Sequence, residues 1–119
     1  MGGSGLSGYA HKLVQILFAT DNNTTTEVSI AGHRLVGIAL PATLEVGGGL
    51  TITPQVDPGD GVFRSVKDEG SADVTFTTVV ADDYLLLPLD ERPVGALCRL
   101  EFSENQTADR NIFLLLEKL

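Results

Sequence analysis

Few residues of this sequence have both the type and the spacing that chemistry requires. Its two histidines, His11 and His33, lack the i, i+4 or Cys-x-x-Cys context of a metal site, so we interpret each as a surface residue at a strand end. No Gly-x-Ser-x-Gly nucleophile elbow occurs. Cys98 lies in the apolar run ALCRLEF, which favours a small buried thiol over an activated nucleophile. These residues predict neither a catalytic centre nor a bound cofactor.

The acidic residues also lack a constellation suited to catalysis. The pairs Asp82-Asp83 and Asp68-Glu69 are adjacent in sequence, and adjacent side chains on a strand point to opposite faces, so neither pair can share one substrate. The loop from Asp57 to Gly61, with a second acid at Asp60, could hold a calcium ion, but it lacks the spacing of an EF-hand. We interpret it as a plain turn, with calcium as the alternative, and we expect no enzymatic activity.

Charge and hydropathy limit the classes of partner that the chain is expected to bind. The chain has 16 acidic and 8 basic residues, a net charge of −8, and its basic residues are scattered singly. Nucleic-acid binding needs clustered Lys and Arg, so it is not expected. No run approaches the ~18 apolar residues of a membrane helix, and the N-terminus lacks the features of a signal peptide. We expect a soluble protein, made in the cytoplasm, that binds no membrane.

The length of 119 residues predicts one domain, preceded by a short arm. Residues 1–10 begin with MGGSGLSG, a Gly/Ser composition typical of flexible chain, and residues 11–119 form the predicted domain. Gly3, Gly5 and Gly8 fit a dinucleotide fingerprint by chance, because no strand precedes them.

Short β-branched and aromatic runs bounded by turn residues predict an all-β protein. We expect strands at residues 12–19, 26–31, 34–40, 50–56, 62–66, 73–78, 83–87, 97–103 and 111–117. In residues 50–55 and 99–103 apolar and polar residues alternate, which predicts one buried face for each strand. Closely spaced strands with little helix predict a jelly-roll-like antiparallel β-sandwich, in which residues 34–40 form a central strand and 41–49 cross between the sheets.

The apolar positions of these strands predict the core. Its expected members are Leu35, Ile38, Leu40, Leu50, Ile52, Val56, Phe63, Phe76, Leu85, Leu87, Leu100, Phe102, Ile112 and Leu114.

Several runs also match the motifs of a known group. A strand and the corner after it match Leu35 to Ile38 with Pro41, and a hairpin matches Gln55 with Asp60-Gly61. Two later strands match Tyr84 to Leu87, followed by Pro88, and Cys98 to Leu100. The last strand matches Arg110 to Leu114. Over residues 28–116 the chain resembles small structural proteins encoded by tailed bacteriophages. The segment 1–18 and the pair Asp57-Pro58 depart from that pattern.

The resemblance implies a jelly-roll-like sandwich on the virion. It implies a capsid decoration (cement) protein, made in the bacterial host cytoplasm, that binds the major capsid protein at the capsid surface, self-associates as a homotrimer and stabilises the shell. The alternative is a tail- or fibre-associated module that binds a receptor or carbohydrate. The absence of Trp and the 6% aromatic content favour the structural role, because sugar recognition uses exposed aromatic platforms.

The N-terminal region supplies the candidate interface. The Gly/Ser arm has little to bury, and the run 13–18 is apolar and β-prone enough to be a liability as an exposed edge. We expect this run to be covered by its own sheet or by a neighbouring subunit through strand addition. The candidate interface residues are Gly2, Gly3, Ser4, Leu6, Tyr9 and Leu13.

Overall fold

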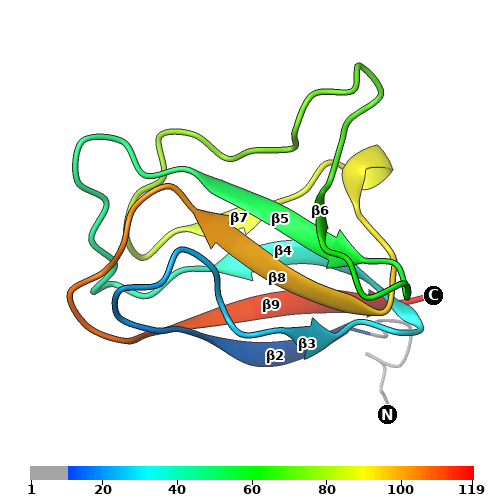
Figure 1. Cartoon of the computed structure of the whole chain (residues 1–119), viewed down its shortest axis with the longest axis horizontal. Coiled ribbons are helices and arrows are strands. Elements are labelled where there is room, and N and C mark those ends of the chain that lie inside the picture. Colours follow the sequence, from blue (N-terminus) through cyan, green and yellow to red (C-terminus); the bar gives the residue numbers. More distant parts are fainter. Residues whose placement is uncertain (1–10) are drawn as a thin grey trace, which may run out of the picture.

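The computed structural model describes residues 11–119, and these residues form two antiparallel sheets (Figure 1). The strands are β2 (His11–Phe18), β3 (Val28–Ser29), β4 (His33–Ala39), β5 (Ile52–Asp57), β6 (Arg64–Ser65), β7 (Tyr84–Leu86), β8 (Leu97–Phe102) and β9 (Arg110–Lys118). Within the described residues the only helical element is the short 3-10 helix η1 (Leu89–Glu91). The predicted all-β class is confirmed.

The strand order is that of a rolled double hairpin. One sheet has the order β2-β9-β4-β7 and the other β3-β8-β5-β6. Among these eight strands, the first therefore pairs with the last, the second with the second to last, and so on inwards. The pairs are β2 with β9, β3 with β8, β4 with β7 and β5 with β6. This pairing, rolled into two facing sheets, is the expected jelly-roll arrangement.

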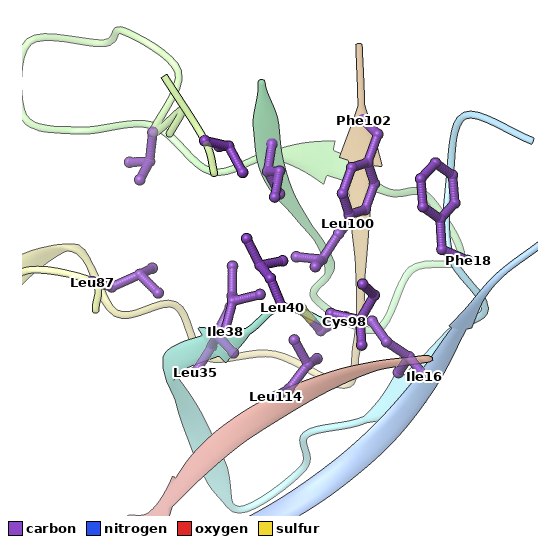
Figure 2. Close-up of a cluster of buried hydrophobic side chains, with 14 of the residues drawn as sticks. Ile16, Phe18, Leu35, Ile38, Leu40, Leu87, Cys98, Leu100, Phe102 and Leu114 are labelled. Atoms are coloured by element: carbon purple, nitrogen blue, oxygen red, sulfur yellow. The ribbon is translucent and has the colours of Figure 1, made fainter. Parts of the chain in front are cut away.

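The core lies between the two sheets (Figure 2). Phe18 of β2 and Phe102 of β8 stack across the sandwich, with ring centroids 4.1 Å apart and an interplanar angle of 15°. Stacking of this kind adds to the free energy gained by burying the two rings. The buried hydrophobic cluster contains Ile16, Phe18, Ile30, Leu35, Ile38, Leu40, Leu44, Leu50, Ile52, Val56, Val74, Val79, Leu87, Cys98, Leu100, Phe102, Ile112, Leu114 and Leu116.

The predicted core is mostly confirmed. Phe76 and Leu85 are only partly buried, although both pack against the cluster. Phe63 lies outside the cluster: its ring sits under the Arg99 guanidinium, with Cζ 4.2 Å from the ring centroid. Phe63 is therefore a wrong core assignment, because its aromatic ring is used in a cation–π contact rather than between the sheets.

Three of the predicted strands are much shorter than expected or do not form. Residues 26–31 and 62–66 contribute only the two-residue strands β3 and β6, and residues 73–78 form no strand. The backbone of that last segment pairs with its neighbours through isolated bridges, Lys67 with Asp73 and Ile52 with Phe76, and not through a continuous ladder. Val74 of this segment is buried, as is Val79 just after it, so burial there does not require a continuous ladder.

The alternation expected for residues 50–55 is also corrected. All six residues of β5 are buried, including the polar Thr53 and Gln55. The segment after β6 runs beside this strand, where Ile52 and Phe76 exchange backbone hydrogen bonds. Next to that pair, the Thr53 and Thr75 hydroxyls are 2.8 Å apart. Gln55 Oε1 accepts a hydrogen bond from Arg99 Nε at 2.8 Å. The polar side chains of β5 are thus buried with hydrogen-bond partners. In β8, by contrast, Leu100 and Phe102 are buried and Glu101 is exposed, as predicted.

The central strand and the corner after it agree with the prediction. β4 lies between β9 and β7, and its residues 35–38 are buried. The following segment, 40–51, connects β4 of one sheet to β5 of the other. Leu44 N–H donates to the Pro41 carbonyl at 3.2 Å, and Gly47 adopts a φ of +52°, which glycine tolerates without strain.

Candidate functional site

The outer side of the sheet β2-β9-β4-β7, which faces away from the core, carries large apolar side chains. The pairing register aligns Leu13, Leu115, Gly37 and Leu86 in one row across the four strands. The next row consists of Gln15, Phe113, Ala39 and Tyr84. Residues directly opposite one another in an antiparallel sheet share a face, so these rows form one continuous surface. We call Leu13, Leu86, Tyr84, Phe113 and Leu115 the outer apolar face.

Three members of the outer apolar face are strongly exposed. Leu13 is 60% exposed, Leu86 is 56% exposed and Tyr84 is 48% exposed. Phe113 and Leu115, on the strand between them, are partly buried. Single exposed hydrophobic residues are ordinary, but a contiguous apolar patch on a sheet marks a binding surface or an aggregation liability.

Tyr84 is held over the middle of this face by the absence of a side chain at Gly37. Its ring crosses the glycine so closely that a Cβ there would lie 2.8 Å from Oη and 2.9 Å from Cε1. The glycine therefore makes room for the ring, which extends the apolar surface from β7 over β4.

One end of the outer apolar face is closed by a charged row. Glu117 of β9 lies opposite His11 of β2 and Arg34 of β4. Arg34 Nε donates a hydrogen bond to Glu117 Oε1, and His11 Nε2 lies 3.4 Å from Glu117 Oε2. The Arg34 hydrogen bond, followed by smaller contributions from Arg34 and His11 charge, lowers the pKa of Glu117. The face is thus apolar in its centre and ionic at one border, as protein interfaces commonly are.

A second polar cluster ties two loops together at the end of the sandwich where β4 and β8 finish. The Glu45 carboxylate accepts hydrogen bonds from Thr107 and, at 2.7 Å, from Arg110 Nη2. Gln106, which is 1% exposed, donates from Nε2 to the Glu45 carbonyl at 2.8 Å and accepts from the Glu45 N–H at 2.8 Å. These reciprocal bonds fix loop 41–49 against loop 103–109.

The residues considered as possible metal ligands or nucleophiles, His11, His33 and Cys98, occupy structural positions. His11 and His33 begin β2 and β4, which confirms their placement at strand ends. Cys98 is buried in β8, and this burial raises the pKa of its thiol to about 12. The thiol is therefore protonated at neutral pH and is not an activated nucleophile.

The acidic residues serve in turns. Asp57 Oδ1 accepts hydrogen bonds from the N–H groups of Gly59 at 2.8 Å and Gly61 at 3.1 Å. Asp60 pairs with Arg64 Nη2 at 2.9 Å. Asp68 Oδ1 accepts from the N–H groups of Gly70 and Ala72. The interpretation of the Asp57 loop as a turn built by its own carboxylates accounts for these contacts.

Of the candidate interface residues, Leu13 alone lies in the described part of the chain, and it belongs to the outer apolar face. Gly2, Gly3, Ser4, Leu6 and Tyr9 lie outside the described residues. Tyr84, Leu86, Phe113 and Leu115 were not singled out as surface residues. The unbroken apolar run from Ile112 to Leu116 is the signal that could have revealed part of this face, because a strand with one polar side would alternate.

Residues 11–119 contain no group of three or more His, Cys, Asp or Glu side chains that could hold a metal ion. In the same residues no helix is long and apolar enough to cross a membrane.

Comparisons with known proteins locate no family. No protein-family model matches the chain, and no curated protein matches it. Among solved structures, it is similar to the crystal structure of PirA, with 19% identity, 91% of this chain and 93% of that chain covered, and a TM-score of 0.43. It is also similar to the Drosophila NLP-core, whose structure is described as giving insight into pentamer formation and histone binding, with 11% identity, 90% and 97% coverage and a TM-score of 0.36. At these TM-scores neither likeness bears on function.

Proposed function

We propose that the chain is a structural protein of a tailed-bacteriophage virion, which decorates the capsid and stabilises the assembled shell of major capsid protein. The observation that carries this proposal is the outer apolar face, which offers a continuous apolar surface to a partner protein. The sequence motifs of residues 28–116 resemble those of small phage structural proteins, and this resemblance is the reason for proposing the major capsid protein as the partner.

The outer apolar face is wide enough to contact a neighbouring protein. Neighbouring strands lie about 4.8 Å apart, so the row from Leu13 on β2 to Leu86 on β7 spans roughly 14 Å. Burying exposed Leu and Tyr side chains stabilises a complex by about 25 cal/mol for each Å² of apolar surface removed from water. Many copies of such a contact around a shell would join neighbouring capsid subunits.

The N-terminal arm belongs to the same proposal. Residues 1–10 contain Leu6 and Tyr9 and lead directly into β2, the strand that carries Leu13. We assign these residues to attachment, and the protein to a homotrimer on the shell. Deleting Met1 to Gly8 should leave the domain folded and reduce the copies retained on particles after dilution or heating. Full retention would remove the arm from the proposal.

The test of the outer apolar face uses particles of the encoding phage that lack the protein. Purified protein is added, the particles are sedimented, and the bound copies are counted. Leu86→Asp should reduce binding about tenfold or more, because an unpaired carboxylate would be buried against the partner. Val62→Asp is the matched control, since Val62 is 50% exposed but lies in the loop between β5 and β6, on the other sheet. Equal binding by the two variants would contradict the proposal.

A receptor- or carbohydrate-binding module of a tail or fibre is the second candidate, and Tyr84 is the observation that favours it. Its exposed ring, which lies across Gly37, is the kind of platform on which a sugar stacks. Loss of binding to host-cell glycans in Tyr84→Ala, together with no binding to shells, would select this candidate over the capsid role.

A further inference from the structure

β2 has the one long open edge among the described strands. It has eight residues and pairs with β9 along its whole length without a register shift. The strands at the other sheet edges are short: β7 has three residues, and β3 and β6 have two each. Short edges are a common protection against unwanted pairing, whereas a long regular edge invites another strand.

The open backbone groups of β2 can be identified from the contacts of Leu17. On the side away from β9, Leu17 N–H donates to Thr26 Oγ1 at 2.9 Å, and the Leu17 carbonyl accepts from Thr26 N–H at 2.8 Å. Successive residues of a strand direct these groups to alternate sides, so Gln15 and Leu13 face the same open side as Leu17. Among the described residues, Gln15 and Leu13 have no hydrogen-bond partner on that side.

We propose that this edge pairs with β2 of a second copy of the chain, antiparallel and around a two-fold axis at Val14. A two-fold axis perpendicular to a sheet sets a residue opposite itself, and its neighbours opposite each other in reverse order. With the axis at Val14, Leu13 lies opposite Gln15 of the second copy, and Gln15 opposite its Leu13. Each such pair exchanges two N–H···O=C bonds, or about four in total.

The register follows from which groups are open. An axis at Gln15 would set Leu13 opposite Leu17, whose N–H and C=O are already bonded to Thr26. Only the axis at Val14 sets the two open residues, Leu13 and Gln15, opposite one another in both strands. The Thr26 contact ends the ladder on either side, so the paired region is short and self-complementary.

Side chains and charge also favour a second copy at this edge. β2 contains no acidic residue in a chain whose net charge is −8, so like charges are largely kept away from the contact. The two Leu13 side chains become diagonal neighbours on the outer side of the joined sheet, within reach of each other. Their contact covers the 60% exposed Leu13 and joins the outer apolar faces of the two copies.

This inference concerns the edge of β2 and does not depend on what the outer apolar face binds. A two-fold edge contact also leaves the rest of each protomer available for a three-fold contact. Failure of shell binding therefore leaves the edge contact standing, and the reverse holds as well.

Cysteine cross-linking in the full chain tests the register. Two Val14 residues on the axis would form a non-hydrogen-bonded pair with Cα atoms about 4.5 Å apart, within the range of a disulfide. Val14→Cys should give a disulfide-linked dimer with oxidised glutathione, whereas Leu13→Cys and Gln15→Cys, offset diagonally, should not. The native Cys98 is buried and does not compete. Absence of the Val14→Cys dimer, or equal cross-linking at all three positions, would overturn the proposal.

A proline variant tests the hydrogen bonds without a cross-link. Gln15→Pro removes an N–H that faces the open edge, so the ladder with β9 stays complete, and proline is tolerated on edge strands. Its self-association, measured by sedimentation over a series of concentrations, should be lost. Gln15→Thr keeps the N–H and should associate like the natural chain. A monomeric natural chain at every concentration, or association by Gln15→Pro equal to Gln15→Thr, would contradict the contact. The cysteine variants decide the matter if Gln15→Pro does not fold.

Discussion

The Tyr84 ring lies across Gly37, with Oη 2.8 Å from the position that a Cβ on the glycine would take. Gly37→Ala should therefore destabilise the natural chain by about 1 kcal/mol, because the ring must move off the sheet. In a Tyr84→Ala background the same change should stabilise the chain by roughly 0.5–1 kcal/mol, since alanine restricts the unfolded strand more than glycine does. Denaturant unfolding of the four proteins measures this reversal of sign, and an unchanged sign would mean that the ring does not rest on Gly37.

Gly95 is a second position where the lack of a side chain is required. A Cβ there would lie 2.3 Å from Val56 Cγ1 and 3.1 Å from the Asp57 carbonyl oxygen. Gly95→Ala should lower the free energy of unfolding by about 1–3 kcal/mol or more, because a backbone atom and a core side chain must both shift. Gly48→Ala is the matched control, since nothing lies within 4 Å of its Cβ position. Equal stabilities of the two variants would contradict the packing at Gly95.

The core between the sheets should respond to truncation in the usual way. Ile38 and Leu100 are fully buried on facing sheets, so replacing either by Ala should cost about 2–5 kcal/mol. Val80→Ala, at a residue that is about half exposed, should change the unfolding midpoint little. A midpoint unaffected by Leu100→Ala would place that side chain outside the core.

The fold class follows from local sequence signals, and its exceptions come from contacts that are distant in sequence. Alternation in residues 99–103 predicted the buried side of β8 because that strand has one polar face. In β5 the same pattern failed, because the segment around Thr75 returns beside the strand and places the Thr75 hydroxyl against that of Thr53. A sequence pattern records side-chain polarity, and it does not record which distant segment lies beside a strand.

The outer apolar face could not be predicted from the sequence for a related reason. Tyr84 and Leu86 were expected to lie in a strand, and they do. Their position beside Phe113 and Leu115 depends on the register of β7 on β4 and of β4 on β9, which includes an irregularity between Leu35 and Gly37. A shift of one residue would turn these side chains to the opposite side of the sheet.

The Asp57 loop should be stable without a metal ion. Asp57 is buried, and its Oδ1 already accepts the Gly59 and Gly61 N–H groups, while Asp60 pairs with Arg64. EDTA should therefore leave the melting temperature unchanged, whereas Asp57→Ala should cost about 1–3 kcal/mol by leaving two N–H donors unpaired. A melting temperature that falls in EDTA and recovers with calcium chloride would instead make this loop a calcium site.

Acid should weaken the join between loops 41–49 and 103–109 through Glu45. Hydrogen bonding from Thr107, with smaller contributions from Arg110, lowers the pKa of Glu45 below its ordinary value of 4.5. A carboxylate whose pKa is lower in the folded chain contributes stability above its unfolded pKa, and this contribution is lost as the pH falls through the folded pKa.

Glu45→Gln should therefore be less stable than the natural chain at neutral pH, and the difference should shrink as the solution is acidified below the ordinary Glu pKa of 4.5. Thr107→Val removes the largest cause of the shift, so it should raise the pKa of Glu45 itself, which NMR titration of the carboxyl carbon measures. Urea unfolding at a series of pH values gives the stability differences. A Glu45→Gln curve parallel to that of the natural chain at every pH would show that the Thr107 and Arg110 contacts do not stabilise the ionised carboxylate.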